Sequence, residues 1–202
     1  MLPYHQKEQL ENLPSGDYCF YCLQPNPRKI IGPQQILYEC LQCGKIDGLK
    51  IKLDPQLKLS WHNNEAQHFT IGALLKNLKT GKYLIMKKRT YPFFLDIIAG
   101  HIKTEETPEQ TLLREVKEET GITIQKYKKI WDGMIEGYPC RRGALNHYWY
   151  IFLATFDEKP IPHIQEVSYF KEYAWEEILN EKMLNPPLIK VFAGFNTSLL
   201  TT

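Results

Sequence analysis

Two groups of residues in this 202-residue sequence have types and spacings that could do chemistry. The first is a run of glutamates, Glu115, Glu118 and Glu119, directly after Arg114. Because they lie three and four positions apart, a helix would gather their carboxylates on one face, where they repel one another. Hard dications such as Mg²⁺ and Mn²⁺ prefer oxygen ligands and bridge to phosphate oxygens. The run therefore predicts a Mg²⁺ or Mn²⁺ site for a phosphate compound.

The second group is formed by cysteines. Four of the five cysteines form two C-x-x-C pairs, Cys19 with Cys22 and Cys40 with Cys43. The spacing within and between the pairs is typical of a tetrahedral zinc site. Four thiolates leave no open coordination position, so this Zn²⁺ would hold the fold and would not catalyse. Two disulfides, or free thiols in a metal-free loop, are the alternatives.

A helix must present the glutamates, and the sequence predicts one over residues 107–120. Thr107 is a good N-cap, Pro108 suits the first helical position, and Gln110 completes a capping box. Gly121 is expected to end the helix. Apolar residues share one side of this helix, so the opposite side is free to offer carboxylates.

The remaining pattern predicts an α/β fold in which helices pack on a mixed sheet. Runs rich in β-branched and aromatic residues indicate strands at 69–78, 82–89, 122–134 and 146–156, with a shorter one at 169–174. Helices are expected at 175–184 and 187–195. The cysteine-rich segment is too small to own a core, and the polar stretch 61–67 is typical of a linker. We therefore expect two domains, residues 1–57 and 68–202.

The spacing of residues around the helix resembles a known motif. From Gly100 the chain has five residues before Glu106, seven more before Arg114, and then the sequence R-E-V-K-E-E-T-G-I. This resembles the Nudix box, G-x5-E-x7-R-E-U-x-E-E-x-G-U, at every specified position. The resemblance implies a Nudix fold, a mixed sheet sandwiched by helices, and hydrolysis of a pyrophosphate bond.

The resemblance also implies roles for the acidic residues. Glu115 and Glu119 are expected to bind the catalytic Mg²⁺ or Mn²⁺, with Glu118 a further ligand or the general base. In some Nudix hydrolases a later loop supplies the base, and Glu166 is the candidate here. A bound dication would neutralise substrate charge and lower the pKa of the attacking water.

The sequence also suggests roles for three further residues in or next to the box. Arg114 cannot act as a base, and we expect it to orient a glutamate through a charge-assisted hydrogen bond. Gly100 is expected to permit a tight turn that lets a nearby backbone carbonyl, that of Ala99, face the metal. His101 is expected to be a loop residue.

The box identifies the reacting bond and leaves the substrate open. ADP-ribose-like compounds come first, then other nucleotide sugars, NAD(H) and nucleoside triphosphates. The cysteine-rich segment, residues 1–57, resembles the zinc ribbon of NADH pyrophosphatases, but the S-Q-P-W-W sequence that follows the Nudix box in those enzymes is missing. The alternative is a catalytically inactive, Nudix-like nucleotide sensor whose zinc ribbon contacts nucleic acid or protein. Isoprenoid diphosphate isomerisation would need an active-site cysteine. The only one unassigned is Cys140, which we expect to be a spare thiol.

Composition narrows the partners. A formal charge of +2, from 25 basic and 23 acidic residues, provides no global field for nucleic acid. Binding of nucleic acid through the ribbon is therefore unsupported. The longest apolar stretch, residues 148–156, falls far short of the roughly 20 residues that cross a bilayer. With no secretory signal and paired cysteines, we expect a cytoplasmic enzyme without membrane contact, and a homodimer as in many Nudix relatives.

Overall fold

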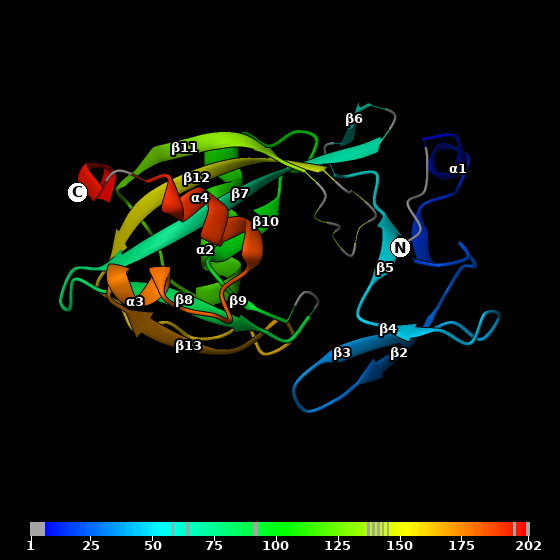
Figure 1. The fold of residues 1–202 in the computed structure, drawn as a ribbon, viewed down its shortest axis with the longest axis horizontal. Coiled ribbons are helices and arrows are strands. Elements are labelled where there is room, and N and C mark those ends of the chain that lie inside the picture. The colour runs from blue at the N-terminus through cyan, green and yellow to red at the C-terminus, as the bar shows by residue number, and fades with distance from the viewer. Residues whose placement is uncertain are drawn as a thin grey trace.

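The computed structural model describes residues 7–57, 59–63, 65–90, 93–136, 138, 140, 142, 144, 146–195 and 197–200. An N-terminal ribbon lies beside a larger α/β unit, as Figure 1 shows. The expected fold class, α/β with a small cysteine-rich N-terminal ribbon, is confirmed.

The larger unit is built on a mixed sheet, to which the described residues contribute eight strands. Its main path runs β11-β12-β7-β8-β13, with β6 and β10 also paired to β7 and β9 paired to β8. Only β7 and β12 run parallel among these described pairs. The strands are β6 Leu59–His62, β7 Glu65–Asn77, β8 Tyr83–Lys88, β9 Leu95–Asp96, β10 Ile98–His101, β11 Tyr127–Ile135, β12 Asn146–Phe156 and β13 Val167–Tyr173.

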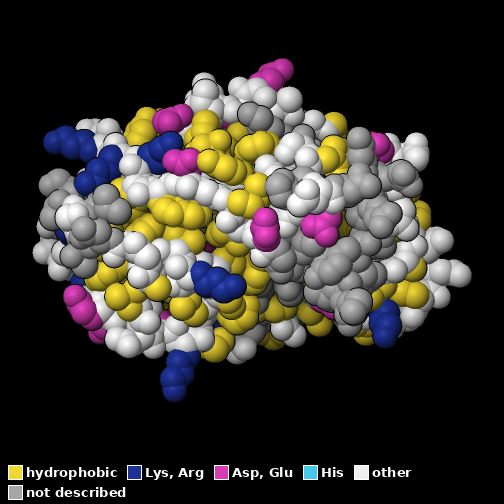
Figure 2. Space-filling model, turned by 45° about the horizontal axis from the view of Figure 1, so that its top comes forward, with side chains coloured by type: hydrophobic (Ala, Val, Ile, Leu, Met, Phe, Trp, Pro, Cys, Tyr) yellow, Lys and Arg dark blue, Asp and Glu magenta, His cyan; other side chains and the backbone are white. Residues whose placement is uncertain are grey.

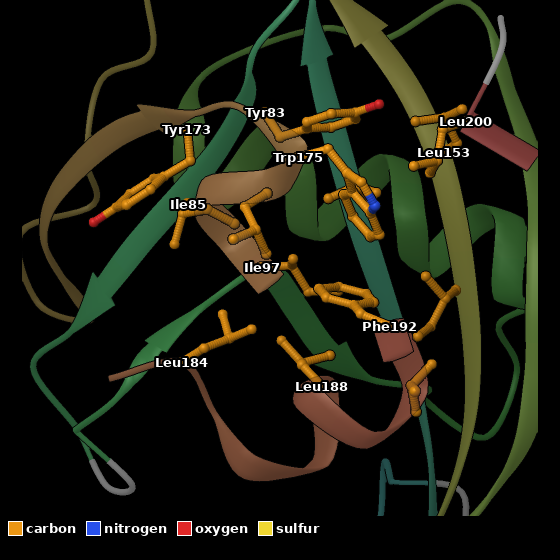
Figure 3. Close-up of a cluster of buried hydrophobic side chains, with 14 of the residues drawn as sticks. Tyr83, Ile85, Ile97, Leu153, Tyr173, Trp175, Leu184, Leu188, Phe192 and Leu200 are labelled. Carbon is orange, nitrogen blue, oxygen red and sulfur yellow. The ribbon is translucent and has the colours of Figure 1, made fainter. Parts of the chain in front are cut away.

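Helices cover both faces of this sheet. Successive residues of a strand point to opposite faces, so the strands present apolar side chains for helices to pack on at each face. On one face, Leu112 and Val116 of α2 (Pro108–Thr120) pack with Ile71 of β7. On the other face, Trp175 of α3 (Trp175–Leu179) and Phe192 of α4 (Pro186–Ala193) pack with neighbouring strand residues. Figure 3 shows this second cluster. The sheet is therefore sandwiched by helices, as predicted. A short 3-10 helix, η1 (Thr197–Leu200), ends the described chain.

Helix α2 begins and ends where the sequence predicted. The hydroxyl of Thr107 accepts a hydrogen bond from the Gln110 backbone N–H at 3.2 Å, and the Gln110 side chain accepts one from the Thr107 N–H at 2.9 Å. Gly121 adopts the left-handed conformation, with φ of 73°, and closes the last turn. The capping box and the glycine stop are confirmed, so the box glutamates start from a rigid helix.

Two predicted elements differ most from their observed bounds. The strand expected from residue 122 begins only at Tyr127, because Ile122 and Ile124 pack into the α2 cluster before the chain joins the sheet. The helix expected over 175–184 ends at Leu179, and Asn180 caps it. The strand at 146–156 was predicted with its observed bounds.

The N-terminal ribbon consists of small sheets around the cysteine pairs. Strands β1 (Gly16–Cys19) and β5 (Lys50–Leu53) pair with each other. A separate three-stranded sheet is formed by β2 (Arg28–Ile31), β3 (Ile36–Glu39) and β4 (Ile46–Asp47). The helix α1 (Lys7–Glu11) precedes both sheets.

The expected linker at 61–67 is instead part of the sheet. Strand β6 pairs antiparallel with the start of β7, with Trp61 opposite Ala66. Both side chains join an apolar cluster with Phe20 and Ile51 of the ribbon. The linker prediction was wrong because this polar-looking segment carries two apolar side chains that the ribbon needs for its core.

The surface mixes charges of both signs. Basic and acidic side chains are interspersed among hydrophobic ones on the face drawn in Figure 2, in line with the near-balanced composition. Within the described part of the chain, none of the helices combines the length and apolarity that crossing a bilayer requires.

Candidate active site

One cavity gathers most of the acidic residues that the sequence singled out. Glu115 and Glu119 of α2, Ala99 of β10 and Glu166, just before β13, all line it. Glu166 comes from the loop that was predicted to bring a base. The structure therefore places three acidic side chains and the expected backbone position around one space.

Glu115 lies directly against Gly100. A Cβ atom built on Gly100 would lie 1.9 Å from the Glu115 carboxyl carbon. Gly100 is inside β10, paired with Ile71, so the expected tight turn at this residue is wrong. The motif glycine is needed here for its missing side chain, which leaves room for the carboxylate beside the strand.

Glu119 is the most deeply buried of the box glutamates, with 5% of its surface exposed. Burial raises its pKa well above 4.5; the nearby Lys88 opposes that rise, and Glu115 and Glu166 reinforce it. Its Oε2 atom has no hydrogen-bond partner among the described residues. A buried carboxylate oxygen without a partner is costly, and a cation in the cavity would relieve that cost.

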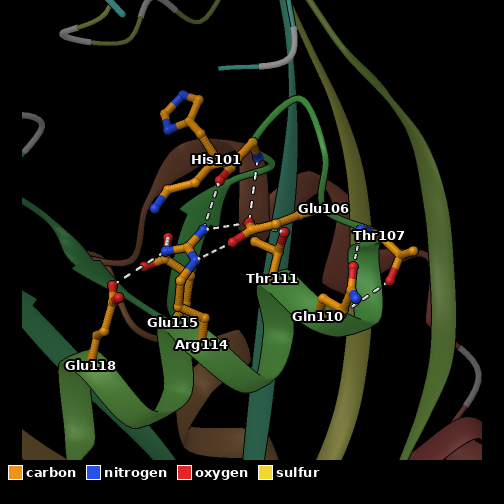
Figure 4. Close-up of polar contacts among 9 residues, drawn as sticks. His101, Glu106, Thr107, Gln110, Thr111, Arg114, Glu115 and Glu118 are labelled. Carbon is orange, nitrogen blue, oxygen red and sulfur yellow. Dashed lines mark hydrogen bonds and ion pairs between the residues drawn. The ribbon is translucent and has the colours of Figure 1, made fainter. Parts of the chain in front are cut away.

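The Arg114 guanidinium donates hydrogen bonds to three glutamates (Figure 4). Its Nε and Nη2 donate to the two oxygens of Glu106 at 2.7 and 2.8 Å. Its Nη1 donates to Glu115 at 2.6 Å and to Glu118 at 3.2 Å. The hydrogen bonds from Arg114 to glutamates that we expected are thus present. Chiefly through them, the pKa of Glu106 falls to about 2, helped by a hydrogen bond from Thr111.

Glu115 and Glu118 differ in environment although one guanidinium nitrogen binds both. Desolvation raises the pKa of the Glu115 carboxyl, and the charge of Arg114 partly offsets this rise. The Glu118 side chain is 58% exposed and is not among the residues that line the cavity in the described structure. Glu118 therefore stands at the outer rim, next to Glu115.

Arg89 fixes the backbone that carries Glu166. The Arg89 N–H donates to the Glu166 carbonyl at 2.8 Å, and its Nη1 donates to the Ile164 carbonyl at 2.5 Å. Its Nη2 donates to the carbonyl of Gly32 in the ribbon at 3.2 Å, and its own carbonyl accepts from Ile36 at 3.0 Å. One arginine thus joins the ribbon to the loop of the candidate base.

Three of the polar cavity residues that were not predicted form a connected group. Asp96 is fully buried, bonded to Lys88 at 2.8 Å and to the Asn185 amide at 2.9 Å. A buried charge is tolerated only with partners of this kind. Nothing local in the sequence distinguishes these three residues from other polar residues of the chain.

A second chemical cluster lies in the same region. His68, His101, Cys140 and His147 each offer a ligand atom, and these atoms all lie within 4.8 Å of one another. His101 ends strand β10, so its expected place in a loop is wrong. Burial lowers the pKa of His147 to about 4 and that of His68 well below 6.5, which keeps both imidazoles neutral.

The four ribbon cysteines also converge. Sγ of Cys19 lies 3.7 Å from Sγ of Cys43, and Sγ of Cys22 lies 3.6 Å from Sγ of Cys40. Tetrahedral coordination with Zn–S bonds of about 2.3 Å separates neighbouring sulfurs by about 3.8 Å. None of the four is in a disulfide. Their arrangement therefore fits a tetrahedral metal ion.

Comparison with known proteins gives one family. The NUDIX domain model matches residues 66–195. The comparison with curated proteins gave no match.

Several solved structures share the fold of the larger unit at low sequence identity. The MutT protein of Methanosarcina mazei Go1 is 21% identical over 63% of this chain and 91% of its own, with a TM-score of 0.55. The NUDIX domain of Shewanella oneidensis NrtR, complexed with ADP ribose, is 20% identical over 70% and 95%, with a TM-score of 0.55. The E. coli dihydroneopterin triphosphate pyrophosphohydrolase is 16% identical over 63% and 93%, with a TM-score of 0.53. At these identities the likeness is one of fold.

Proposed function

Because this chain belongs to the Nudix family, we propose that it uses Mg²⁺ or Mn²⁺ to hydrolyse the pyrophosphate bond of a nucleoside diphosphate linked to another group. The observation that carries the proposal is the buried Oε2 of Glu119, which has no hydrogen-bond partner within the described residues and lies in a cavity that Glu115 and Glu166 also line. Carboxylates that converge on one cavity suit a hard dication that binds phosphate oxygens.

Each side chain has a role in this proposal. Glu115 and Glu119 hold the metal, the Ala99 carbonyl faces it, and Glu118 is a further ligand from the outer rim. A bound dication would polarise the phosphorus and lower the pKa of a coordinated water. Arg114 keeps the Glu115 carboxylate in place through its 2.6 Å hydrogen bond. Glu166 takes a proton from the attacking water as general base.

The electrostatics of the cavity support this division of roles. The pKa of Glu119 is raised chiefly by burial and then by Glu115 and Glu166, so these carboxylates destabilise one another's charge. A dication removes that repulsion and returns the carboxylates to the ionised form that binds metal. Lys88 also lines the cavity next to Glu119, and its positive charge is bonded to Asp96 at 2.8 Å.

We place ADP-ribose-like compounds first among substrates, followed by other nucleotide sugars, NAD(H) and nucleoside triphosphates. This order is supported by the NrtR NUDIX domain, which has the same fold and is complexed with ADP ribose. We further propose that the four ribbon cysteines bind structural Zn²⁺, on the strength of their tetrahedral spacing.

The test is a hydrolysis screen of the full-length protein against a nucleotide library with Mg²⁺ and with Mn²⁺, with products identified by mass. We expect the products of pyrophosphate cleavage. In the Glu119→Gln variant, kcat should fall by at least about 100-fold. Glu109→Gln, an exposed glutamate on the first turn of the same helix, is the matched control and should keep full activity.

The same screen tests the competing function. A catalytically inactive nucleotide sensor would bind a library member in equilibrium dialysis and release no product with either metal. Full activity in a folded Glu119→Gln variant would instead remove the assigned role of this carboxylate.

A further inference from the structure

We propose that His68, His101, Cys140 and His147 bind a transition-metal ion, Zn²⁺ first, at a site separate from the Nudix glutamates and from the ribbon cysteines. The ligand atoms that these four residues offer all lie within 4.8 Å of one another. Nothing in the proposed hydrolysis requires this ion, so the inference goes beyond that function.

The sheet register explains why the three histidines converge. His68 on β7 is directly opposite His147 on the parallel strand β12. His101 on β10 pairs with Thr70, two residues along β7, which shares the face of His68. Three neighbouring strands thus present imidazoles to one space, with ring centroids 4.9 to 6.0 Å apart.

Cys140 closes the fourth side. Its Sγ lies 3.7 Å from Nδ1 of His68. A tetrahedral zinc ion with bonds of about 2.3 Å to sulfur and about 2.05 Å to nitrogen would hold these two atoms about 3.6 Å apart. The observed separation fits without rearrangement of this pair.

An independent observation points to a ligand in this space. Nε2 of His147 is buried and has no hydrogen-bond partner among the described residues. A histidine that served only as packing would be expected to satisfy that nitrogen, because a buried polar atom without a partner destabilises the fold. Coordination of a cation would satisfy it.

The donor set selects the class of metal. Three imidazole nitrogens and one thiolate suit borderline metals such as Zn²⁺, whereas Mg²⁺ and Mn²⁺ prefer oxygen. With four protein ligands the coordination sphere is closed, which is typical of a structural ion. This ion would tie the segment after β11, which carries Cys140, to β7, β10 and β12.

The location joins this site to the cavity of the glutamates. His101, Cys140 and His147 line the same cavity as Glu115 and Glu119. Three neutral imidazoles, one thiolate and Zn²⁺ carry a net charge of +1. The bound ion would therefore add positive charge to a cavity that several carboxylates line.

The experiment measures metal content per chain by mass spectrometry after the full-length protein is equilibrated with Zn²⁺ and desalted. We expect His147→Ala and Cys140→Ser each to contain one ion fewer per chain than the wild type, whatever the ribbon holds. His163→Ala, an exposed histidine, is the matched control and should keep the wild-type content. Glu119→Gln should also keep it, which separates this proposal from the hydrolytic one.

Cobalt gives a second readout. In Co²⁺-loaded protein, Cys140→Ser should lose one thiolate-to-cobalt charge-transfer contribution, while His163→Ala leaves the spectrum unchanged. Folding of each variant is checked by circular dichroism. If folded Cys140→Ser has both the wild-type zinc content and the wild-type cobalt spectrum, the site does not exist.

Discussion

The carboxylate of Glu115 occupies the space that a side chain on Gly100 would fill, with the closest approach at 1.9 Å from a Cβ atom. Gly100→Ala should therefore push the carboxylate out of the cavity and lower kcat by about 100-fold, because displacement of a catalytic group by about 1 Å has that effect. Steady-state kinetics would show it. The atoms displaced belong to a flexible side chain, so the fold should survive.

Gly194→Ala is the matched control for that substitution. Gly194 follows α4 with φ of −88°, and an added Cβ would meet its nearest atom, the Val191 carbonyl oxygen, at 3.5 Å. This variant should hydrolyse at the wild-type rate. Wild-type kcat in Gly100→Ala would show that the position of the Glu115 carboxylate is unimportant.

Glu119 should cost stability when no dication is bound. Its pKa in the folded protein lies well above 4.5, chiefly through burial, so the folded chain holds a proton that the unfolded chain releases as pH rises above 4.5. The free energy of unfolding therefore falls with rising pH above 4.5, up to the folded pKa. At pH 7 in Mg²⁺-free buffer, Glu119→Gln should be more stable than wild type by about 1 kcal/mol or more.

Chemical denaturation with and without Mg²⁺ would check this prediction. Mg²⁺ should stabilise the wild type and leave Glu119→Gln almost unchanged, because a ligand stabilises only the state that binds it. If Glu119→Gln is less stable than the wild type without Mg²⁺, the buried Glu119 carboxylate does not destabilise the metal-free fold, which contradicts this prediction.

The ion pair of Glu106 with Arg114 should contribute in the opposite pH direction. The pKa of Glu106 is lowered to about 2, so its stabilisation is present above its ordinary value of 4.5 and is lost as pH falls towards 2. Glu106→Gln should lower stability at pH 7 by about 1 kcal/mol, a value reduced for partial exposure.

Thermal unfolding from pH 7 to pH 3 would measure that contribution. The difference in Tm between wild type and Glu106→Gln should narrow below pH 4.5. Its exposed neighbour provides the control, since Glu105→Gln should follow the wild type throughout. A difference that stays constant with pH would mean that the charge of Glu106 is not what stabilises the helix.

Loss of a ribbon cysteine should destabilise the ribbon much more than the large sheet. Cys22→Ala removes one of four converging sulfurs, so amide hydrogen exchange should accelerate across residues 16–53, with much less change in β7 and β12. Leu41→Ala is the control, because Leu41 lies between the two cysteines of the second pair and is 80% exposed. Equal acceleration in both regions would contradict the predicted division into domains 1–57 and 68–202.

The part of the site that depends on local structure could be predicted from sequence. The cap of α2, its glycine stop and a hydrogen bond from Arg114 to a glutamate all follow from spacing along one helix and the loop before it, although the sequence did not single out Glu106 as the partner. The role of Gly100 was misjudged, because a contact between a strand and a helix side chain leaves no local signal.

The residues that sequence reasoning missed come from pairing between distant segments. His68 and His147 meet only because β7 and β12 align in one particular register, and a shift by one residue would separate them. Asp96 and Asn185 meet across a comparable distance in sequence. The linker prediction failed for the same reason, since Trp61 and Ala66 acquire their packing partners from another domain.

Arg89 connects the ribbon to the loop that carries Glu166. Its guanidinium spans from the Gly32 carbonyl to the Ile164 carbonyl, while its backbone N–H supports Glu166. A movement of the ribbon at Gly32 would therefore reach, through the Arg89 side chain, the loop that carries Glu166, the proposed general base. Through this contact the ribbon would set how firmly the proposed general base is held.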